Sequence, residues 1–252
     1  MPTVFCSSVL WPAGRYGLPM PKSHCPIANG FSWTPGHIHQ DLEDGGNQTT
    51  ISPNVHLQVT LIKNDVLRFF CMKTDGIDTN RKTWPAGQYC IYQQGSNCPA
   101  GMLSGSVLWD DKNGANNNWN FGSLPKGVYK ADTQIFFCCH TNGSFQKPIE
   151  LPIDKPFYLI ACTPHCQEVL NTVHTMEYIV YDTEDDNNHD NQTYPYPYGA
   201  DFKPPRIHYC YYQGTVLLNV LPKAPDMALQ TDMALQTLQF CCTKVRLTGW
   251  NV

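Results

Sequence analysis

The segment Thr133-Gln-Ile-Phe-Phe-Cys-Cys139 has the composition of a half-buried β-strand and ends in two adjacent cysteines. Neighbouring side chains of a strand point to opposite faces of the sheet. We therefore expect Cys138 and Cys139 to form disulfides with two different partners, one on each face. A second adjacent pair, Cys241 and Cys242, leads to the same expectation. The sequence thus predicts two strands that are cross-linked on both faces.

The chain has 12 cysteines in 252 residues. Zinc sites usually contain close C-x2-C pairs, and no such pair occurs here; the tightest spacings are Cys162-x3-Cys166 and the two adjacent pairs. Disulfides formed in an oxidising compartment explain this number better than metal binding does. We expect every cysteine to be paired and assign no connectivity: Cys6, Cys25, Cys71, Cys90, Cys98, Cys138, Cys139, Cys162, Cys166, Cys210, Cys241 and Cys242.

The composition is that of a folded domain with few charges. Apolar residues make up 42% of the chain and charged residues only 15%, against roughly 25% in typical soluble domains. The net charge is −4 and no basic stripe is present, which argues against nucleic acid as a partner. No run of about 18 apolar residues occurs, so no membrane span is predicted. No low-complexity linker divides the chain, and we expect residues 1–252 to form a single domain.

Strand patterns recur along the chain, whereas helix patterns are few. Residues 55–62 alternate apolar and polar side chains, as a half-buried strand does. The two best helix windows, residues 166–175 and 225–238, are short; the second contains a tandem Asp-Met-Ala-Leu-Gln-Thr repeat, which we interpret as a local duplication without function. We predict a mainly β fold, a disulfide-rich antiparallel β-sandwich-like single domain with at most short helices. Further strands are expected at residues 66–71, 89–92, 106–109, 157–162, 177–181, 209–212, 215–220 and 238–242.

Three turns share one pattern: Trp11-Pro-Ala-Gly-Arg-Tyr16, Trp84-Pro-Ala-Gly-Gln-Tyr89 and Leu124-Pro-Lys-Gly-Val-Tyr129. Proline fixes φ, and a glycine two residues later supplies a positive φ, so each turn should lead into a strand that begins with tyrosine. The Asn142-Gly143 dipeptide follows a strand directly and predicts a hairpin. Tryptophans 11, 84 and 109 stand at strand edges, and we expect them in the core.

These motifs together resemble the C-terminal domain of apextrin. The resemblance rests on the run Trp11-Pro-Ala-Gly-Arg-Tyr-Gly-Leu-Pro-Met-Pro-Lys-Ser-His-Cys-Pro26, the other two turns, Gln40-Asp-Leu-Glu-Asp44, Trp109-Asp-Asp111, Phe136-Phe-Cys-Cys139, Asp182-Thr-Glu-Asp185 and Tyr209-Cys-Tyr-Tyr212, and spans residues 8–245 or so. One position departs from the family pattern, because His24 stands where a glycine usually precedes the cysteine.

The resemblance implies a stand-alone domain without the perforin-like domain that some family members carry. It also implies an extracellular innate-immune protein that recognises bacterial cell walls, namely peptidoglycan and its muramyl-peptide fragments, without catalysis. Structural roles in the extracellular matrix are implied for some members, so a self-associating adhesion protein is the first alternative. A secreted glycan hydrolase is the second, since acidic residues such as Asp41 and Asp110 could act as its paired carboxylates.

The segment Asn191-Gln-Thr-Tyr-Pro-Tyr-Pro-Tyr-Gly199 is the leading candidate for ligand contact. Its prolines keep it extended and out of a sheet ladder, so Tyr194, Tyr196 and Tyr198 cannot all be buried. A rigid aromatic loop can stack on a sugar ring, and the neighbouring acidic stretch can accept hydrogen bonds from hydroxyl and amide groups. The remaining candidates for ligand contact are Trp33, Asp41, Glu43, Asp44, Trp119, Asp182 and Glu184.

The sequence also bears on whether the protein binds a metal ion and in which compartment it resides. The acidic stretches at 41–44, 110–113 and 182–186 have the oxygen ligands that calcium prefers, without the spacing of an EF-hand, and we count calcium only as a possible ligand. His37 and His39 with Asp41 could bind a transition metal, but we interpret them as loop residues. The N-terminus has no leader-like apolar run, and we expect a signal peptide to have been removed from a secreted protein. Three sequons support secretion, at Asn47, Asn142 and Asn191.

Overall fold

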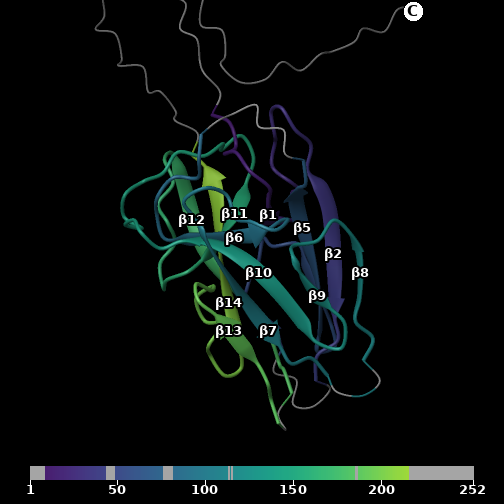
Figure 1. Cartoon of the computed structure of the whole chain (residues 1–252). Coiled ribbons are helices and arrows are strands. Elements are labelled where there is room, and N and C mark those ends of the chain that lie inside the picture. Colours follow the sequence, from purple (N-terminus) through teal and green to yellow (C-terminus); the bar gives the residue numbers. More distant parts are fainter. Residues whose placement is uncertain are drawn as a thin grey trace, which may run out of the picture. The chain divides into compact units, whose positions relative to one another are not determined.

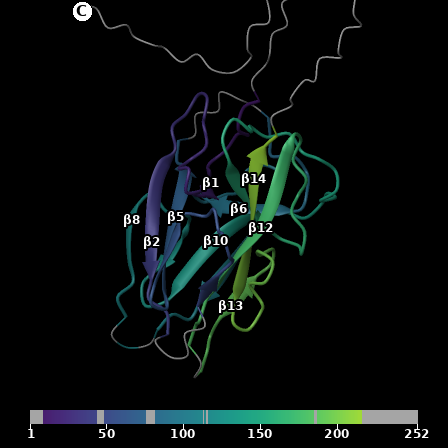
Figure 2. The same ribbon diagram turned by 180° about the vertical axis from the view of Figure 1, so that it is seen from behind.

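The computed structural model describes residues 9–43, 49–75, 82–112, 114, 116–184 and 187–215. These residues contain strands and no helix (Figures 1 and 2). The mainly β prediction is thereby confirmed, and Val9–Thr215 form one compact unit. The strands are β1 (Tyr16–Pro19), β2 (Thr34–Gln40), β3 (Thr50–Ile51), β4 (Val59–Ile62), β5 (Asp65–Lys73), β6 (Tyr89–Gln93), β7 (Leu103–Trp109), β8 (Trp119–Gly122), β9 (Gly127–Tyr129), β10 (Thr133–His140), β11 (Phe157–Ala161), β12 (Thr172–Val180), β13 (Asn191–Thr193) and β14 (Arg206–Gly214).

The strands belong to one antiparallel network that branches at β6. Its main path runs β3-β12-β14-β11-β6-β1-β5-β2-β8. One edge of β6 pairs with β10 over four residues, while its other edge is divided between β11 and β1. Strand β10 continues the branch to β7, which also pairs with β13. In both ribbon views β10 crosses between the β12–β14 side and the β2–β5 side of the molecule (Figures 1 and 2).

Two hydrophobic cores lie on opposite faces of β6 and β11. Along β6, Tyr89 and Ile91 belong to one core, while Cys90 and Tyr92 belong to the other. All five residues of each strand are buried, because side chains that alternate between two faces meet a core on both. Burial on both faces explains why the sequences of these two strands are almost entirely apolar or aromatic. It also matches the predicted sandwich-like packing.

Four disulfides cross-link the sheet: Cys25–Cys71, Cys90–Cys139, Cys98–Cys138 and Cys166–Cys210. The adjacent pair on β10 behaves as predicted, since Cys138 lies in one core and Cys139 in the other. Cys162 is the exception, because it has no disulfide partner among the described residues. Its sulfur lies 3.6 Å from the carbonyl oxygen of His140, and burial raises the pKa of its thiol to about 12. The prediction of complete pairing is therefore not met at Cys162 within the described chain.

The three tyrosine turns share a hydrogen bond that the sequence did not reveal. In each, the tyrosine hydroxyl donates to the carbonyl oxygen of the proline four residues earlier, at 3.0 Å for Tyr16, 2.5 Å for Tyr89 and 2.8 Å for Tyr129. Tyr16 and Tyr89 begin strands as predicted, whereas Tyr129 ends one.

Only one of the three turn glycines has the positive φ that we predicted, at Gly14 with φ 108°. At the other two turns the glycine allows close approach instead, to a backbone oxygen at Gly127 and to a side chain at Gly87. A Cβ at Gly127 would lie 2.2 Å from the carbonyl oxygen of Gln134, and one at Gly87 would lie 2.4 Å from Gln167 Oε1. His24, which replaces the usual family glycine, has a φ of 67°. That position therefore requires the left-handed conformation in which glycine is favoured.

Four local predictions were wrong. His37 and His39, which we interpreted as loop residues, lie on β2, where they pair with Phe69 and Leu67 of β5. Residues 166–175 are not helical: Cys166 is disulfide-bonded to Cys210, Asn171 has a φ of 58°, and β12 begins at Thr172. Residues 55–58 do not continue β4: the backbone N–H groups of His56 and Leu57 donate to a carboxylate described below, and that of Gln58 donates to the carbonyl oxygen of Met20. The Asn142-Gly143 turn does not form a hairpin, since the next strand, β11, pairs with β6 and β14 rather than with β10.

Several predictions fall outside the described residues. They are the disulfides of Cys6, Cys241 and Cys242, the acidic residue Asp44, the sequon at Asn47, the helix window at 225–238 with its tandem repeat, and the strands at 216–220 and 238–242. The single domain predicted for residues 1–252 stays a prediction for the same reason.

Candidate functional site

The three acidic stretches of the sequence lie next to one another in the fold. The Glu43 backbone N–H donates to the carbonyl oxygen of Asp182 at 3.1 Å, and that of Glu184 donates to the carbonyl oxygen of Asp110 at 3.1 Å. A third bond joins the Lys112 N–H to the carbonyl oxygen of Asp41 at 3.2 Å. Residues 41–43 and 182–184 are thus neighbours, although about 140 residues separate them in the chain.

Asp41 and Asp111 are buried and bind the protein's own polar groups. Asp41 Oδ2 accepts a hydrogen bond from the Asn117 backbone N–H at 2.6 Å. Asp111 is fully buried and accepts from Gln40 Nε2 at 2.6 Å, from Asn118 Nδ2 at 2.8 Å and from the Thr133 hydroxyl. These carboxylates therefore organise the loops around them and present little surface to a ligand.

Protonation of Asp111 should make stability depend on pH. Burial raises the pKa of Asp111 to about 7, against hydrogen bonds from Thr133, Gln40 and Asn118 that lower it. The folded protein keeps this proton at pH values where the unfolded chain, with the ordinary pKa of 3.8, has released it. Its stabilising contribution is complete below about pH 4 and is lost as the pH rises through about 7, with a slope of up to about 1.4 kcal/mol per pH unit.

We expect the Asp111→Asn variant to lose that slope in chemical denaturation series between pH 4.5 and pH 7. The matched control is Asp154→Asn, which neutralises an exposed carboxylate and should leave the slope unchanged. Parallel pH profiles for the wild-type protein and Asp111→Asn would show that the proton is not held on Asp111.

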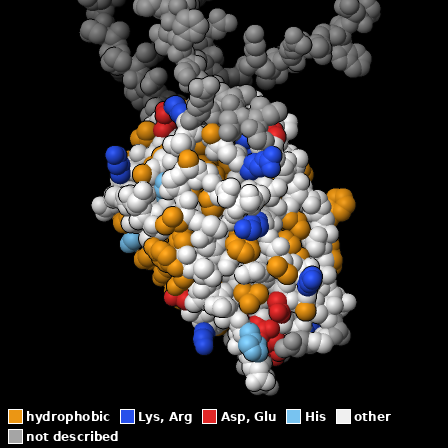
Figure 3. Space-filling view, viewed as in Figure 1, with side chains coloured by type: hydrophobic (Ala, Val, Ile, Leu, Met, Phe, Trp, Pro, Cys, Tyr) orange, Lys and Arg blue, Asp and Glu red, His pale blue; other side chains and the backbone are white. Residues whose placement is uncertain are grey.

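A pocket of about 620 Å³ opens beside the acidic stretches. It is lined by residues 182–184, 188, 190–192 and 200–205. Its carboxylates come from Asp182, Glu184, Asp190 and Asp201, while Lys203 is its cation and Phe202 its aromatic wall. Figure 3 shows acidic side chains around a histidine at the lower end of the molecule, where β13 lies in Figure 1. Ligand pockets typically enclose about 300–1,000 Å³, so this one has the size for a small polar molecule.

The pocket wall is fixed by a compact network around Asp190. Asp190 Oδ1 accepts from the Asp110 backbone N–H at 2.8 Å, and Oδ2 accepts from the Thr183 hydroxyl at 2.6 Å. Asn188 Nδ2 donates to the same hydroxyl at 3.0 Å. Burial raises the pKa of Asp190, in part against these hydrogen bonds. The network holds acceptor groups in place before a ligand arrives, which lowers the entropic cost of binding.

The tyrosine loop follows β13 and is less exposed than its sequence implied. Only Tyr194 is largely exposed, at 69%. Tyr196 packs against one hydrophobic core and Tyr198 against the other. Tyr198 also contacts Phe202 of the pocket, with ring centroids 5.3 Å apart. Within the loop, Tyr194 therefore has the most surface to offer a ligand, while Tyr198 supports the pocket wall.

The two tryptophan candidates have different surroundings. Trp33 packs edge-on against Trp11 and Tyr16 and is partly buried against one hydrophobic core. Trp119 on β8 is 46% exposed and stacks on His39, with ring planes 7° apart. Tryptophans 11, 84 and 109 are buried in the cores as predicted. Asn142 and Asn191 are exposed, and Asn191 lines the pocket.

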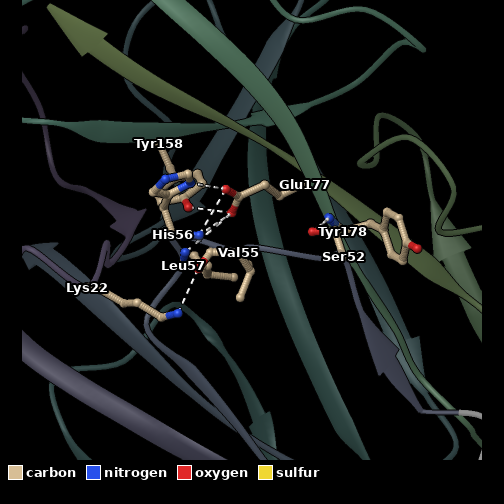
Figure 4. Close-up of polar contacts among 8 residues, drawn as sticks. All are labelled: Lys22, Ser52, Val55, His56, Leu57, Tyr158, Glu177 and Tyr178. Atoms are coloured by element: carbon tan, nitrogen blue, oxygen red, sulfur yellow. Dashed lines mark hydrogen bonds and ion pairs between the residues drawn. The ribbon is translucent and has the colours of Figure 1, made fainter.

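Sequence reasoning missed a buried carboxylate on β12. Glu177 is 2% exposed and accepts hydrogen bonds from the backbone N–H of His56 at 2.9 Å, that of Leu57 at 3.3 Å and the Tyr158 hydroxyl at 2.5 Å. His56 Nδ1 adds a contact of 2.7 Å, and its ring stacks on Tyr211. Figure 4 shows His56 and Tyr158 directed at this carboxylate.

The strand pattern contained a signal for Glu177. It occupies the same face of its strand as Ile179 and Tyr181, which are both buried, so alternation alone would place it inside. Its function in the fold is to hold His56 and Leu57 against the sheet, because its oxygens accept hydrogen bonds from backbone N–H groups that a neighbouring strand would otherwise bind.

Within the described residues, no group of three or more His, Cys, Asp and Glu side chains is arranged to hold a metal ion. No helix long and apolar enough to cross a membrane occurs among these residues either.

Comparison with protein families gives one match. The model of a family described as ApeC, the C-terminal domain of apextrin, matches residues 11–212. Searches of curated proteins and of solved structures returned no match.

Proposed function

Since the chain belongs to the ApeC family, the C-terminal domain of apextrin, we propose that it is a secreted pattern-recognition protein that binds bacterial cell-wall glycopeptide without catalysis. The family is not a known enzyme family. The ligand class is peptidoglycan or its muramyl-peptide fragments, and the binding site is the pocket lined by residues 182–184, 188, 190–192 and 200–205.

The pocket's chemistry is the observation that carries this proposal. The carboxyl groups of Glu184, Asp190 and Asp201 and the amides of the pocket can accept hydrogen bonds from sugar hydroxyls and from N-acetyl or peptide N–H groups, whereas Asp182 is 2% exposed and lies in the wall. Lys203 supplies a cation for a ligand carboxylate, and the exposed face of Phe202 can contact the apolar side of a sugar ring. Muramyl peptides combine all of these groups in one small molecule.

The scaffold supports static recognition in an oxidising environment. Four disulfides and two cores hold the sheet that supports the pocket. A rigid site loses little conformational entropy on binding. Disulfides persist in extracellular compartments, and this supports secretion.

Removing one pocket charge should weaken binding. We expect Glu184→Gln and Lys203→Ala each to reduce the affinity for a soluble muramyl dipeptide by about 10- to 100-fold, since a hydrogen bond to a charged group contributes about 1.5–3 kcal/mol. Isothermal titration calorimetry measures the affinity for the dipeptide, and retention on insoluble peptidoglycan tests binding to the polymer. Protein from a host without N-glycosylation avoids a glycan on Asn191 at the pocket.

The matched controls are Asp154→Asn and Lys155→Ala, which remove exposed charges that do not line the pocket. They should bind as the wild-type protein does. Tyr194→Ala tests the loop separately, and unchanged retention would exclude its most exposed tyrosine from the site. If both pocket variants kept wild-type affinity, the ligand would bind elsewhere. Release of soluble muropeptides during incubation would contradict a non-catalytic role and favour a hydrolase.

A further inference from the structure

Strand β12 is paired along the whole of one edge but only at the end of the other. On one side, Thr172 to Val180 pair with Gly214 to Arg206 of β14. On the other side, β3 pairs only with Ile179 and Val180. The two ribbon views show β12 beside β14 at one side of the sheet (Figures 1 and 2).

The register shows which backbone groups point away from β14. The Thr215 N–H donates to the Asn171 carbonyl oxygen at 2.8 Å, and hydrogen-bonded pairs alternate along an antiparallel ladder. The backbone N–H and C=O groups of odd-numbered residues of β12 therefore bond to β14, and those of even-numbered residues point away from it. Tyr178 agrees, since its outward carbonyl accepts from the Ser52 N–H at 3.0 Å. Toward the start of the strand, the outward groups are those of Thr172, His174 and Met176. No described residue forms a hydrogen bond with them.

Open strand edges are usually protected by lysine, proline, bulges or brevity. The edge at the opposite end of the sheet path, β8, has only four residues. β12 has nine, and its open half, Thr-Val-His-Thr-Met, contains neither lysine nor proline nor any carboxylate. Val173 is 57% exposed and Leu170 just before it is 45% exposed. Among the described residues, this edge therefore has unpaired backbone groups and no device that would repel another strand.

We propose that β12 pairs with β12 of a second copy of this chain, antiparallel about a two-fold axis at His174. In this register each of the three residues with outward backbone groups lies opposite another of the same three. Thr172 lies opposite the partner's Met176, and His174 lies opposite the partner's His174. Each outward pair exchanges two N–H···O bonds, which gives about six across the contact. If the two strands were shifted by one residue, backbone groups that point outward on one copy would lie opposite groups that point toward β14 on the other. A shift by two residues would leave one of the three outward residues of each strand without a partner.

The side chains fit the same register. Val173 lies opposite the partner's Thr175, so the exposed face joins an apolar and a small neutral residue. Asp, Glu, Lys and Arg are absent from residues 171–176, and no such charges repel across the axis. Because the same patch is used on both copies, the contact closes as a dimer and does not propagate into a fibre.

Cross-linking at the axis tests the register. In a hydrogen-bonded antiparallel pair the two Cα atoms lie about 5.5 Å apart, which a disulfide can span. His174→Cys should therefore form a covalent dimer under mild oxidation, with peptide mapping that joins the two substituted positions. Thr172→Cys is the matched control, because the two copies of that position would be about 14 Å apart. Equal cross-linking of the two variants would overturn the proposed register.

Sedimentation velocity at pH 8 tests the contact without added cysteines. The wild-type protein should show a reversible monomer–dimer equilibrium. Val173→Lys places a charge at an exposed position on each strand and should weaken the dimer at least about tenfold. Val173→Thr keeps a β-branched residue and should leave the equilibrium nearly unchanged. A wild-type monomer at about 1 mM, an open-ended assembly, or a dimer that Val173→Lys leaves intact would each overturn the proposal. None of these results depends on the glycopeptide ligand.

Discussion

Replacing both Cys90 and Cys139 by alanine should lower the free energy of unfolding by about 4 kcal/mol. The disulfide joins residues 49 apart in the sequence, and closing a loop of that length accounts for about 4 kcal/mol in the chain-entropy model. Both residues are fully buried in one core, so alanine leaves no polar group unpaired. For a domain of this size we expect the Tm to fall by about 8–16 °C in calorimetry without reductant.

Cys162→Ala is the control for this experiment. It removes a thiol that has no disulfide partner among the described residues, and we expect a change below about 1 kcal/mol. Strong reductant should lower the Tm of the wild-type protein further, since it opens the other disulfides as well. A double variant as stable as Cys162→Ala would mean that the Cys90–Cys139 cross-link contributes nothing to the stability of the sheet.

Replacing Glu177 by alanine should lower the free energy of unfolding by about 3–5 kcal/mol. Its carboxylate satisfies four donor groups, from His56, Leu57 and Tyr158, in a site that is almost fully buried. Without it these donors lose their acceptor, and each buried polar group left unpaired costs about 1–3 kcal/mol. Urea denaturation measures the loss, and faster hydrogen exchange at the amides of His56 and Leu57 locates it.

Two single-group variants define the contributions at this site. Tyr158→Phe removes one hydroxyl and should cost about 1–2 kcal/mol. His56→Ala removes a side chain that is 50% exposed and leaves both backbone donors bonded, so its cost should stay below about 1 kcal/mol. If Glu177→Ala cost no more than His56→Ala, the carboxylate would not be what holds residues 55–58 in place.

Much of the fold could be predicted because its signals are local. Alternating and aromatic segments located the strands near residues 66–71, 89–92, 133–139 and 209–212. The adjacent cysteines on β10 predicted cross-links on both faces, since strand geometry leaves no other arrangement. At His24, a departure from the family glycine coincided with a positive φ. In each case the physical cause lies within a few residues.

The candidate site could not be predicted in the same way. Tyr194, Tyr196 and Tyr198 look alike in sequence, yet only the first is largely exposed, because the other two meet the cores. Asp182, Glu184 and the segment that begins at Asn191 were named as candidates, but residues 200–205 of the pocket, which include Lys203, carried no signal. The open edge of β12 could not be foreseen either, since strand order in a sheet depends on distant segments.

The amino-acid sequence by itself determined the fold class, the family and the two-sided cross-linking of β10, because strand periodicity and cysteine placement act over neighbouring residues. Only the tertiary structure decided which acidic residues organise the protein's own loops, which line a pocket, and which strand edge stays open. Those outcomes depend on hydrogen bonds and burial between segments far apart in the chain, such as Glu43 with Asp182 and Glu177 with His56. No local pattern specifies such partners, since many pairings of the same segments satisfy it equally well.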